Sequence, residues 1–173
     1  MIYIFCATKT EAQAINEHYK LKKSKKYSLN VFQNDNITVI VSGIGKENTQ
    51  KNIDCFFHCF SVTSEDTFVN IGIAAAPKHY PIGSLWKIGR VLYKDDAITI
   101  GCNTKTLQTV DTEQNTPLAH ITDMEGFFIA QFFRQYDFLI YKVISDHFEP
   151  KNITKEAVKQ LLKAALKDLF LMN

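Results

Sequence analysis

The chain alternates short, β-branched apolar runs with segments of helical spacing, and this alternation is its most constraining feature. Two apolar runs, IYIFCA at 2–7 and NITVIVSGIG at 36–45, are each followed by a segment of helical character, at 8–19 and 46–60. Continuous apolar runs of this length are typical of strands that are buried on both faces. Strands that alternate with helices favour a largely parallel sheet covered by helices on both sides.

The second half of the chain continues this alternation with less regular spacing. A third β-rich run spans 67–76, and 83–96 is interpreted as an exposed or antiparallel strand or hairpin arm. Residues 124–136 predict a helix so apolar that it must be mostly buried, and 138–146 predict another strand. The segment 97–122 is polar and irregular, with a short strand expected near 106–110.

An amphipathic helix is expected at 154–172, with an apolar stripe opposite a row of lysines. We find no linker, repeat or low-complexity tract. The sequence therefore predicts a single domain over 1–173, a three-layer α/β/α fold with a central mixed, largely parallel sheet. In such sheets ligands bind beyond the carboxyl ends of the strands.

Charge and composition exclude several classes of protein. Twenty Lys and Arg against eighteen Asp and Glu leave a net charge of +2, which gives no basic surplus for nucleic acid. The lysine-rich run at 20–26 is interpreted as a solvated helix end and loop. No stretch predicts a membrane span or a signal peptide, so we expect a cytoplasmic protein that binds neither nucleic acid nor membrane.

The cysteines predict no disulfide frame. Cys6, Cys55, Cys59 and Cys102 are spread through expected strands and a helix, which is typical of small buried side chains kept reduced. Cys55 and Cys59 could share a helix face with His58 beside them, but structural zinc needs a second ligand pair. We therefore expect neither a metal nor a cofactor.

Three acidic residues are expected where strands end or helices begin. Glu11 follows the first strand, Glu125 starts the apolar helix, and Asp146 ends the strand before the terminal helix. Each could be a helix cap or a first-turn residue favoured by the helix dipole. Together they could supply one cleft with an acid and with anions, which is the pattern of general acid–base chemistry.

Four segments in order carry a family resemblance: SGIGKEN at 42–48, NIGIAAA at 70–76, TDMEG at 122–126 and VISD at 143–146. They resemble the purine nucleoside phosphorylase superfamily, in particular its branch of methylthioadenosine/S-adenosylhomocysteine nucleosidases. The resemblance extends from Met1 to about Asp146. It implies a nucleoside phosphorylase-like fold, a homodimer, a small purine nucleoside as ligand, and hydrolysis of its N-glycosidic bond with release of the free base.

The resemblance also implies roles for individual residues. Asp146 matches the acid that protonates purine N7, and Glu11 matches the carboxylate that activates the attacking water. Glu125 matches the carboxylate that holds the ribose hydroxyls, with Met124 beside it against the sugar. Breaking this bond builds positive charge on the ribosyl group and negative charge on the base, so Asp146 must be protonated while Glu11 is ionised.

The remaining predicted substrate contacts are Ile73, Ala74 and Ser145. Here the sequence departs from the family, because Ile73 and Ala74 stand where a Ser or Thr and small residues are common. Lys142 stands where nucleosidases commonly have arginine, which keeps the charge but loses the planar fork. The chain is also shorter than typical members between Lys94 and Thr122, the region expected to contact the base.

Several functional alternatives stay open from the sequence. The substrate could be methylthioadenosine- or S-adenosylhomocysteine-like, or futalosine-like. Phosphorolysis is disfavoured because the two arginines that we place, Arg90 and Arg134, lie away from the motifs and Glu11 would repel phosphate. A degenerate nucleoside-binding protein with little turnover, and a purely structural domain, are the further alternatives.

Overall fold

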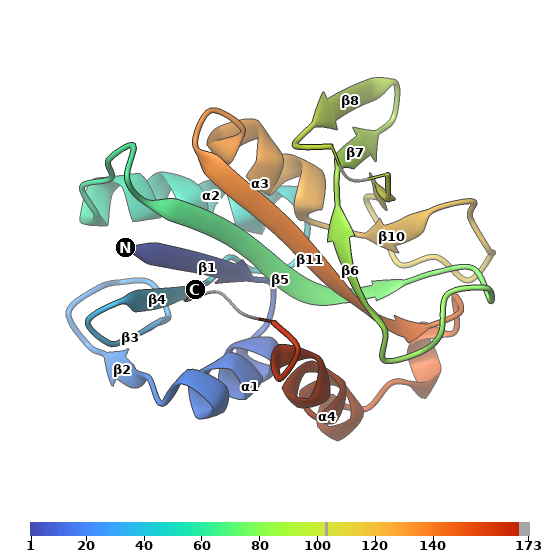
Figure 1. The fold of residues 1–173 in the computed structure, drawn as a ribbon, viewed down its shortest axis with the longest axis horizontal. Coiled ribbons are helices and arrows are strands. Elements are labelled where there is room, and N and C mark those ends of the chain that lie inside the picture. Colours follow the sequence, from blue (N-terminus) through green and yellow to red (C-terminus); the bar gives the residue numbers. More distant parts are fainter. Residues whose placement is uncertain (103, 170–173) are drawn as a thin grey trace.

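The computed structural model describes residues 1–102 and 104–169, and within them eleven strands form one sheet (Figure 1). The strands are β1 (Ile2–Cys6), β2 (Lys22–Ser24), β3 (Val31–Gln33), β4 (Ile37–Val41), β5 (Thr67–Ala75), β6 (Leu85–Ile88), β7 (Arg90–Tyr93), β8 (Asp96–Thr99), β9 (Thr106–Thr109), β10 (Ile121–Asp123) and β11 (Asp137–Asp146). The helices are α1 (Lys9–Tyr19), α2 (Gly45–Cys59), α3 (Gly126–Phe133) and α4 (Lys155–Leu166), with a 3-10 turn η1 (Pro150–Asn152).

The centre of the sheet is parallel. β1 pairs with β4 and β5, and β5 pairs with β11, all in the same direction. The margins are mixed: β3 runs antiparallel to β4, β6 antiparallel to β11, and β10 antiparallel to β5. Because β1, β4, β5 and β11 run together, their carboxyl ends meet at one edge of the sheet.

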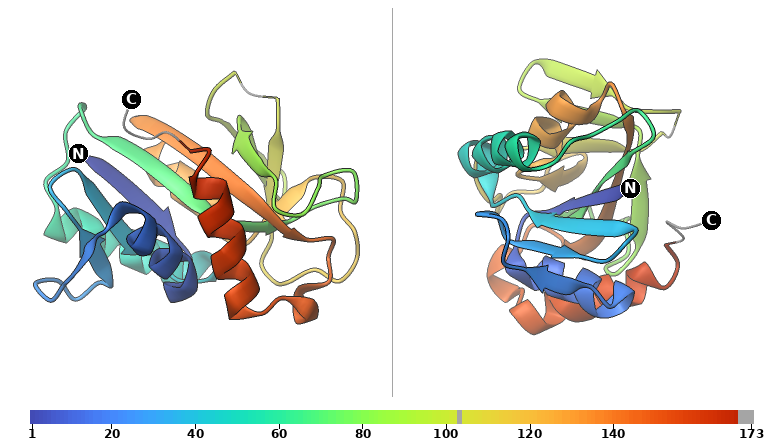
Figure 2. Two further views of the ribbon diagram at one scale, coloured as in Figure 1. Left: turned by 60° about the horizontal axis from the view of Figure 1, so that its bottom comes forward. Right: turned by 90° about the vertical axis from the view of Figure 1, so that its left-hand side faces the viewer.

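Helices cover both faces of the sheet and give three layers (Figure 2). α1 and α4 pack on one face, where their apolar residues join Ile4, Val39 and Ile71 in one buried cluster. α2 and α3 cover the other face in a second cluster that is rich in phenylalanine, including Phe56 and Phe133. The predicted three-layer fold with a mixed, largely parallel sheet is confirmed.

The polar segments differ most from the expectations. The lysine run at 20–26 contains β2, an exposed edge strand, where a loop was predicted. By contrast, 83–96 holds two strands, β6 and β7, that are each antiparallel to a neighbour as expected, and β9 is the short strand expected near 106–110. The strands β8 and β10 were not predicted, because such short strands carry little apolar alternation.

The cysteines and the apolar helices were both subjects of expectations from the sequence. Cys6 is buried as predicted, whereas Cys102 is exposed, so that cysteine does not act as a small core residue. The described cysteines are free thiols. None of the helices within the described ranges is both long and apolar enough to cross a bilayer.

Candidate active site

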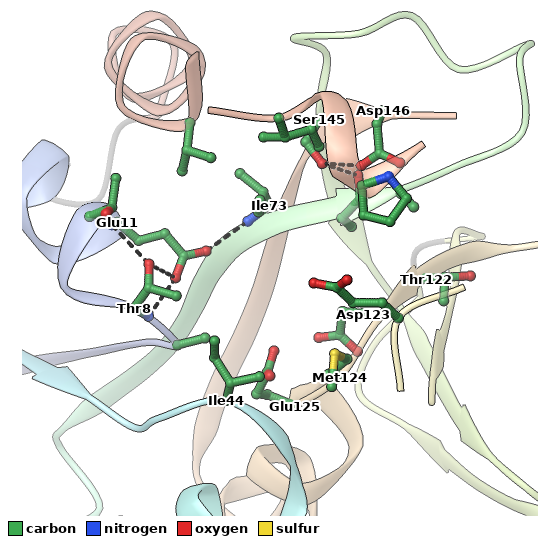
Figure 3. A pocket seen from close by; sticks show the side chains of 18 of the residues that line it. Thr8, Glu11, Ile44, Ile73, Thr122, Asp123, Met124, Glu125, Ser145 and Asp146 are labelled. Atoms are coloured by element: carbon green, nitrogen blue, oxygen red, sulfur yellow. Dashed lines mark hydrogen bonds between the residues drawn. The ribbon is translucent and has the colours of Figure 1, made fainter. Parts of the chain in front are cut away.

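A cavity of about 600 Å³ opens at the edge where the parallel strands end (Figure 3). Its walls come from the turn after β1, from Ile44 after β4, from the end of β5 and from the end of β11. The start of α4 and the segment from β10 into α3 complete it. All the sequence-predicted site residues line it: Glu11, Ile73, Ala74, Met124, Glu125, Ser145 and Asp146.

Glu11 is held by both of its carboxylate oxygens. Oε2 accepts hydrogen bonds from the backbone N–H of Thr8 at 2.7 Å and from the Thr8 hydroxyl at 3.0 Å, while Oε1 accepts from the N–H of Ile73 at 3.0 Å. The Thr8 hydroxyl in turn accepts from the Glu11 N–H, which completes a capping box at the start of α1. Glu11 is only 2% exposed, and these bonds fix its carboxylate against the end of β5.

Glu125 stands at the N-terminus of α3 but bonds to another helix. Its Oε1 accepts from the N–H of Gly45, the first residue of α2, at 2.9 Å. Gly45 has a φ of +78°, a conformation that favours glycine. Burial, and after it the charge of the neighbouring Asp123, raise the pKa of Glu125 to about 8.

An ion pair that the sequence analysis did not predict lies directly behind these acids. The Nζ of Lys142 is 2.7 Å from Oδ2 of Asp123, and both side chains are almost fully buried. Asp123 also accepts hydrogen bonds from the Thr109 hydroxyl and from the N–H of Gly126. A lysine within the apolar run 138–146 was the available signal, since a buried lysine requires a partner.

Asp146 ends β11 and faces the cavity from the side opposite α1 (Figure 3). Its Oδ1 accepts from the N–H of Glu149 at 2.9 Å, and its Oδ2 accepts from the Ser145 hydroxyl at 2.7 Å. The same hydroxyl lies 3.2 Å from the carbonyl oxygen of Ala74. Asp146 is 8% exposed, so it is shielded from bulk water but reachable from the cavity.

The other predicted contacts form the apolar part of the wall. Met124 lies between Asp123 and Glu125, and the side chain of Ile73 faces the cavity near Glu11 (Figure 3). No hydroxyl is therefore offered at position 73, as the sequence indicated. Val110, Glu113 and Gln114 also line the cavity and come from the region expected to contact the base, whereas Thr8, which lines it too, was not singled out from the sequence.

Across residues 1–102 and 104–169, no group of three or more His, Cys, Asp or Glu side chains is placed to hold a metal ion. Cys55 and Cys59, which the sequence had suggested as a weak metal pair with His58 beside them, lie on α2, where His58 Nδ1 is 2.7 Å from the backbone oxygen of Asp54. None of these three residues lines the cavity.

Comparisons with known proteins agree with the architecture. No protein-family model and no curated protein matches the sequence. Among solved structures, the 5′-methylthioadenosine/S-adenosylhomocysteine nucleosidase of Streptococcus pneumoniae, with a transition-state inhibitor, superimposes with a TM-score of 0.79 at 15% identity. That alignment covers 96% of this chain and 95% of the other.

Two further solved structures show the same likeness. The corresponding nucleosidase of Helicobacter pylori, with butyl-thio-DADMe-Immucillin-A, gives a TM-score of 0.76 at 16% identity, over 96% of this chain and 94% of that one. An S-adenosylhomocysteine nucleosidase of Streptococcus pyogenes gives a TM-score of 0.73 at 16% identity, over 98% of this chain and 97% of that one. The chain therefore has the fold of the methylthioadenosine/S-adenosylhomocysteine nucleosidases, as the ordered motifs had indicated.

Proposed function

We propose that this protein is an N-ribosyl hydrolase that cleaves the N-glycosidic bond of a purine nucleoside and releases the free base. The observation that supports this most strongly is the arrangement of three buried carboxyl groups around one cavity. Asp146 lies on one side, Glu11 on another, and Glu125 at the start of α3 (Figure 3). These residues come from widely separated parts of the sequence, and the fold brings them to one edge of the sheet.

The proposed reaction needs one group that protonates the leaving purine and a second group that takes a proton from the attacking water. As the bond between C1′ and N9 breaks, its electrons go to the purine, and Asp146 donates a proton to N7 so that the base leaves neutral. A water oxygen bonds to C1′, and Glu11 takes one of its protons. Positive charge that builds on the ribosyl group is stabilised by the nearby Glu11 carboxylate.

Glu125 and Met124 are proposed to contact the sugar. The carboxyl group of Glu125 can form hydrogen bonds with two ribose hydroxyls, and the thioether of Met124 offers an apolar surface to the ring. Glu125 is itself held by the N–H of Gly45. The sugar would therefore bind where α2 and α3 begin.

Hydrolysis is favoured over phosphorolysis by the partners of Glu11. A phosphate nucleophile needs free donors and cations at the sugar, but the N–H groups of Thr8 and Ile73 already donate to the Glu11 carboxylate. Arg90 and Arg134 do not line the cavity, and its lysines, Lys9 and Lys155, are exposed in the first turns of α1 and α4. A fixed anion at this position repels phosphate and suits water.

The finer assignments rest on the resemblance and the shared fold. We propose a methylthioadenosine- or S-adenosylhomocysteine-like substrate, with a futalosine-like nucleoside as the second choice. The similar solved structures are named as nucleosidases of the first two compounds. We further propose a homodimer that acts in the cytoplasm, which light scattering of the purified protein and fractionation of cells would test.

The proposal is tested by incubating the purified protein with methylthioadenosine in phosphate-free buffer made with ¹⁸O water. Hydrolysis predicts release of adenine and one ¹⁸O atom at C1 of the freed sugar. Release that requires phosphate, with a phosphorylated sugar as product, would show a phosphorylase. Binding without release, detected as a thermal shift, would show a degenerate nucleoside-binding protein.

A further inference from the structure

Thr8 bonds to Glu11 in a way that a helix cap alone does not require. A capping residue needs only to accept a hydrogen bond from the first turn, and the Thr8 hydroxyl does so from the Glu11 N–H at 3.2 Å. The same hydroxyl lies 3.0 Å from Glu11 Oε2 and can donate to it. Thr8 also lines the cavity, so its hydroxyl lies at the border between the helix end and the site.

The partners of Glu11 differ in what they can do when the carboxyl group gains a proton. The N–H groups of Thr8 and Ile73 can only donate, so each is favourable to the ionised carboxylate. A hydroxyl can rotate, and it either donates to a carboxylate or accepts from a carboxylic acid. Thr8 therefore supplies a contact that suits both protonation states of Oε2.

The lack of a hydroxyl at position 73 makes the contact between the Thr8 hydroxyl and Glu11 more important. The Ile73 side chain offers no hydroxyl to the region between Glu11 and the sugar, although its backbone N–H holds Oε1. Thr8 is the hydroxyl that the structure places against the Glu11 carboxylate. Oε1 is fixed by strand β5 and Oε2 by the turn after β1, so the carboxylate has a defined orientation.

We propose that the Thr8 hydroxyl is a positioning group, which holds Glu11 for attack by water and follows its change in protonation during turnover. This inference rests on the proposed function, because it gives Glu11 the role of base. In the resting site the hydroxyl donates to Glu11 Oε2. After Glu11 has taken the proton of water at Oε2, the hydroxyl rotates and accepts from it, and no covalent bond to Thr8 forms or breaks.

The test compares Thr8→Val with Thr8→Ser, using base release from methylthioadenosine between pH 4 and 9. Valine has nearly the shape of threonine but no hydroxyl, so we expect kcat to fall by about tenfold or more, the size of one lost hydrogen bond to a charged group. We expect the acidic limb of the pH profile to move to higher pH, because the ionised carboxylate loses a donor. In Thr8→Ser, kcat and the position of the acidic limb should both return to near wild-type values.

A loss of activity in Thr8→Val could come from a destabilised α1 or from a mispositioned Glu11, and the two must be distinguished. Asp66→Ala is the matched control, since Asp66 holds the N-terminal amine at 2.9 Å near the start of β5, at the end of the sheet away from the cavity. It should lower the unfolding temperature as Thr8→Val does, but leave the pH profile unchanged. The same profile in Thr8→Val and wild type, or an equal loss in Thr8→Ser, would overturn the inference. A wild-type protein that releases no base would overturn the proposed function and this inference with it.

Discussion

The ammonium group of Lys142 pairs with the carboxylate of Asp123 at 2.7 Å beneath the candidate active site, with both side chains 2% exposed or less. Lys142 belongs to β11 and Asp123 to β10, so the pair joins two strands that also carry site residues. Removing one partner leaves the other charge buried and unpaired, which costs about 3–5 kcal/mol. The pair therefore connects the stability of the sheet to the geometry of the acids.

We predict that Lys142→Met lowers the free energy of unfolding by about 3–5 kcal/mol, measured by urea denaturation. Lys142→Arg keeps the charge and should lose much less. In the double variant Lys142→Met with Asp123→Asn the unpaired carboxylate is gone, so part of the stability should return. Additive losses in the double variant would show that the two side chains are not coupled.

Gly72 gives a second test of how Glu11 is held. A Cβ atom at this position would lie 2.9 Å from Glu11 Oε1 and 3.6 Å from Lys142 Nζ. Because the nearest atom is a side-chain oxygen and not the backbone, Gly72→Ala should still fold but displace the carboxylate from its hydrogen bonds. We predict at least a tenfold loss of base release, about the value of one hydrogen bond to a charged group.

Gly101→Ala is the control for Gly72→Ala, since a Cβ there would meet no atom within 4 Å. It should release base at the wild-type rate. Normal activity in Gly72→Ala would mean that Glu11 does not need its present position.

The pKa of Glu125 predicts how stability varies with pH. Burial and the Asp123 charge raise this pKa from an ordinary value of 4.5 to about 8, so the folded protein binds a proton here that the unfolded chain has lost. The contribution of Glu125 is greatest below pH 4.5 and is lost as the pH rises towards 8. In Glu125→Gln this decline should disappear from the unfolding free energy measured between pH 4 and 9.

The amide of glutamine still accepts from Gly45, so Glu125→Gln should fold. Its expected kinetic effect is weaker ribose binding, seen as a raised KM for the nucleoside. An unchanged slope of stability against pH would show that the carboxyl group titrates normally in the folded protein.

Asp146→Asn tests the proposed acid. An amide cannot donate the proton that the leaving purine needs, so turnover should fall by about a hundredfold or more while the unfolding temperature stays close to wild type. Asp137→Asn is the matched control, because Asp137 begins the same strand at its other end and accepts from Thr67. Equal activity in the two variants would remove Asp146 from the mechanism.

Much of this site could be predicted from the sequence because strand ends are easy to locate. Continuous apolar runs gave the positions of β1, β5 and β11, and acids just beyond or at such ends had to meet at one edge of a parallel sheet. Glu11 and Asp146 were found in this way. Glu125 was found at the start of a helix whose apolar sequence required burial.

The supporting contacts could not be predicted, because they depend on register and on side-chain reach. The bond of Glu125 to Gly45 joins two helix starts that are far apart in sequence. The pair of Lys142 and Asp123 depends on strands that are not hydrogen-bonded to each other. In the polar segment 97–122 only β9 was expected, because β8 and β10 lack the alternation that would have shown them.

Base release in phosphate-free buffer, measured side by side for the wild type, Glu11→Gln and Asp146→Asn, tests the central claim most directly. If the carboxyl groups gathered around this cavity carry out hydrolysis together, the wild type frees adenine from methylthioadenosine and each variant loses nearly all of that activity while remaining folded. Adenine release at the wild-type rate in both variants would contradict the account.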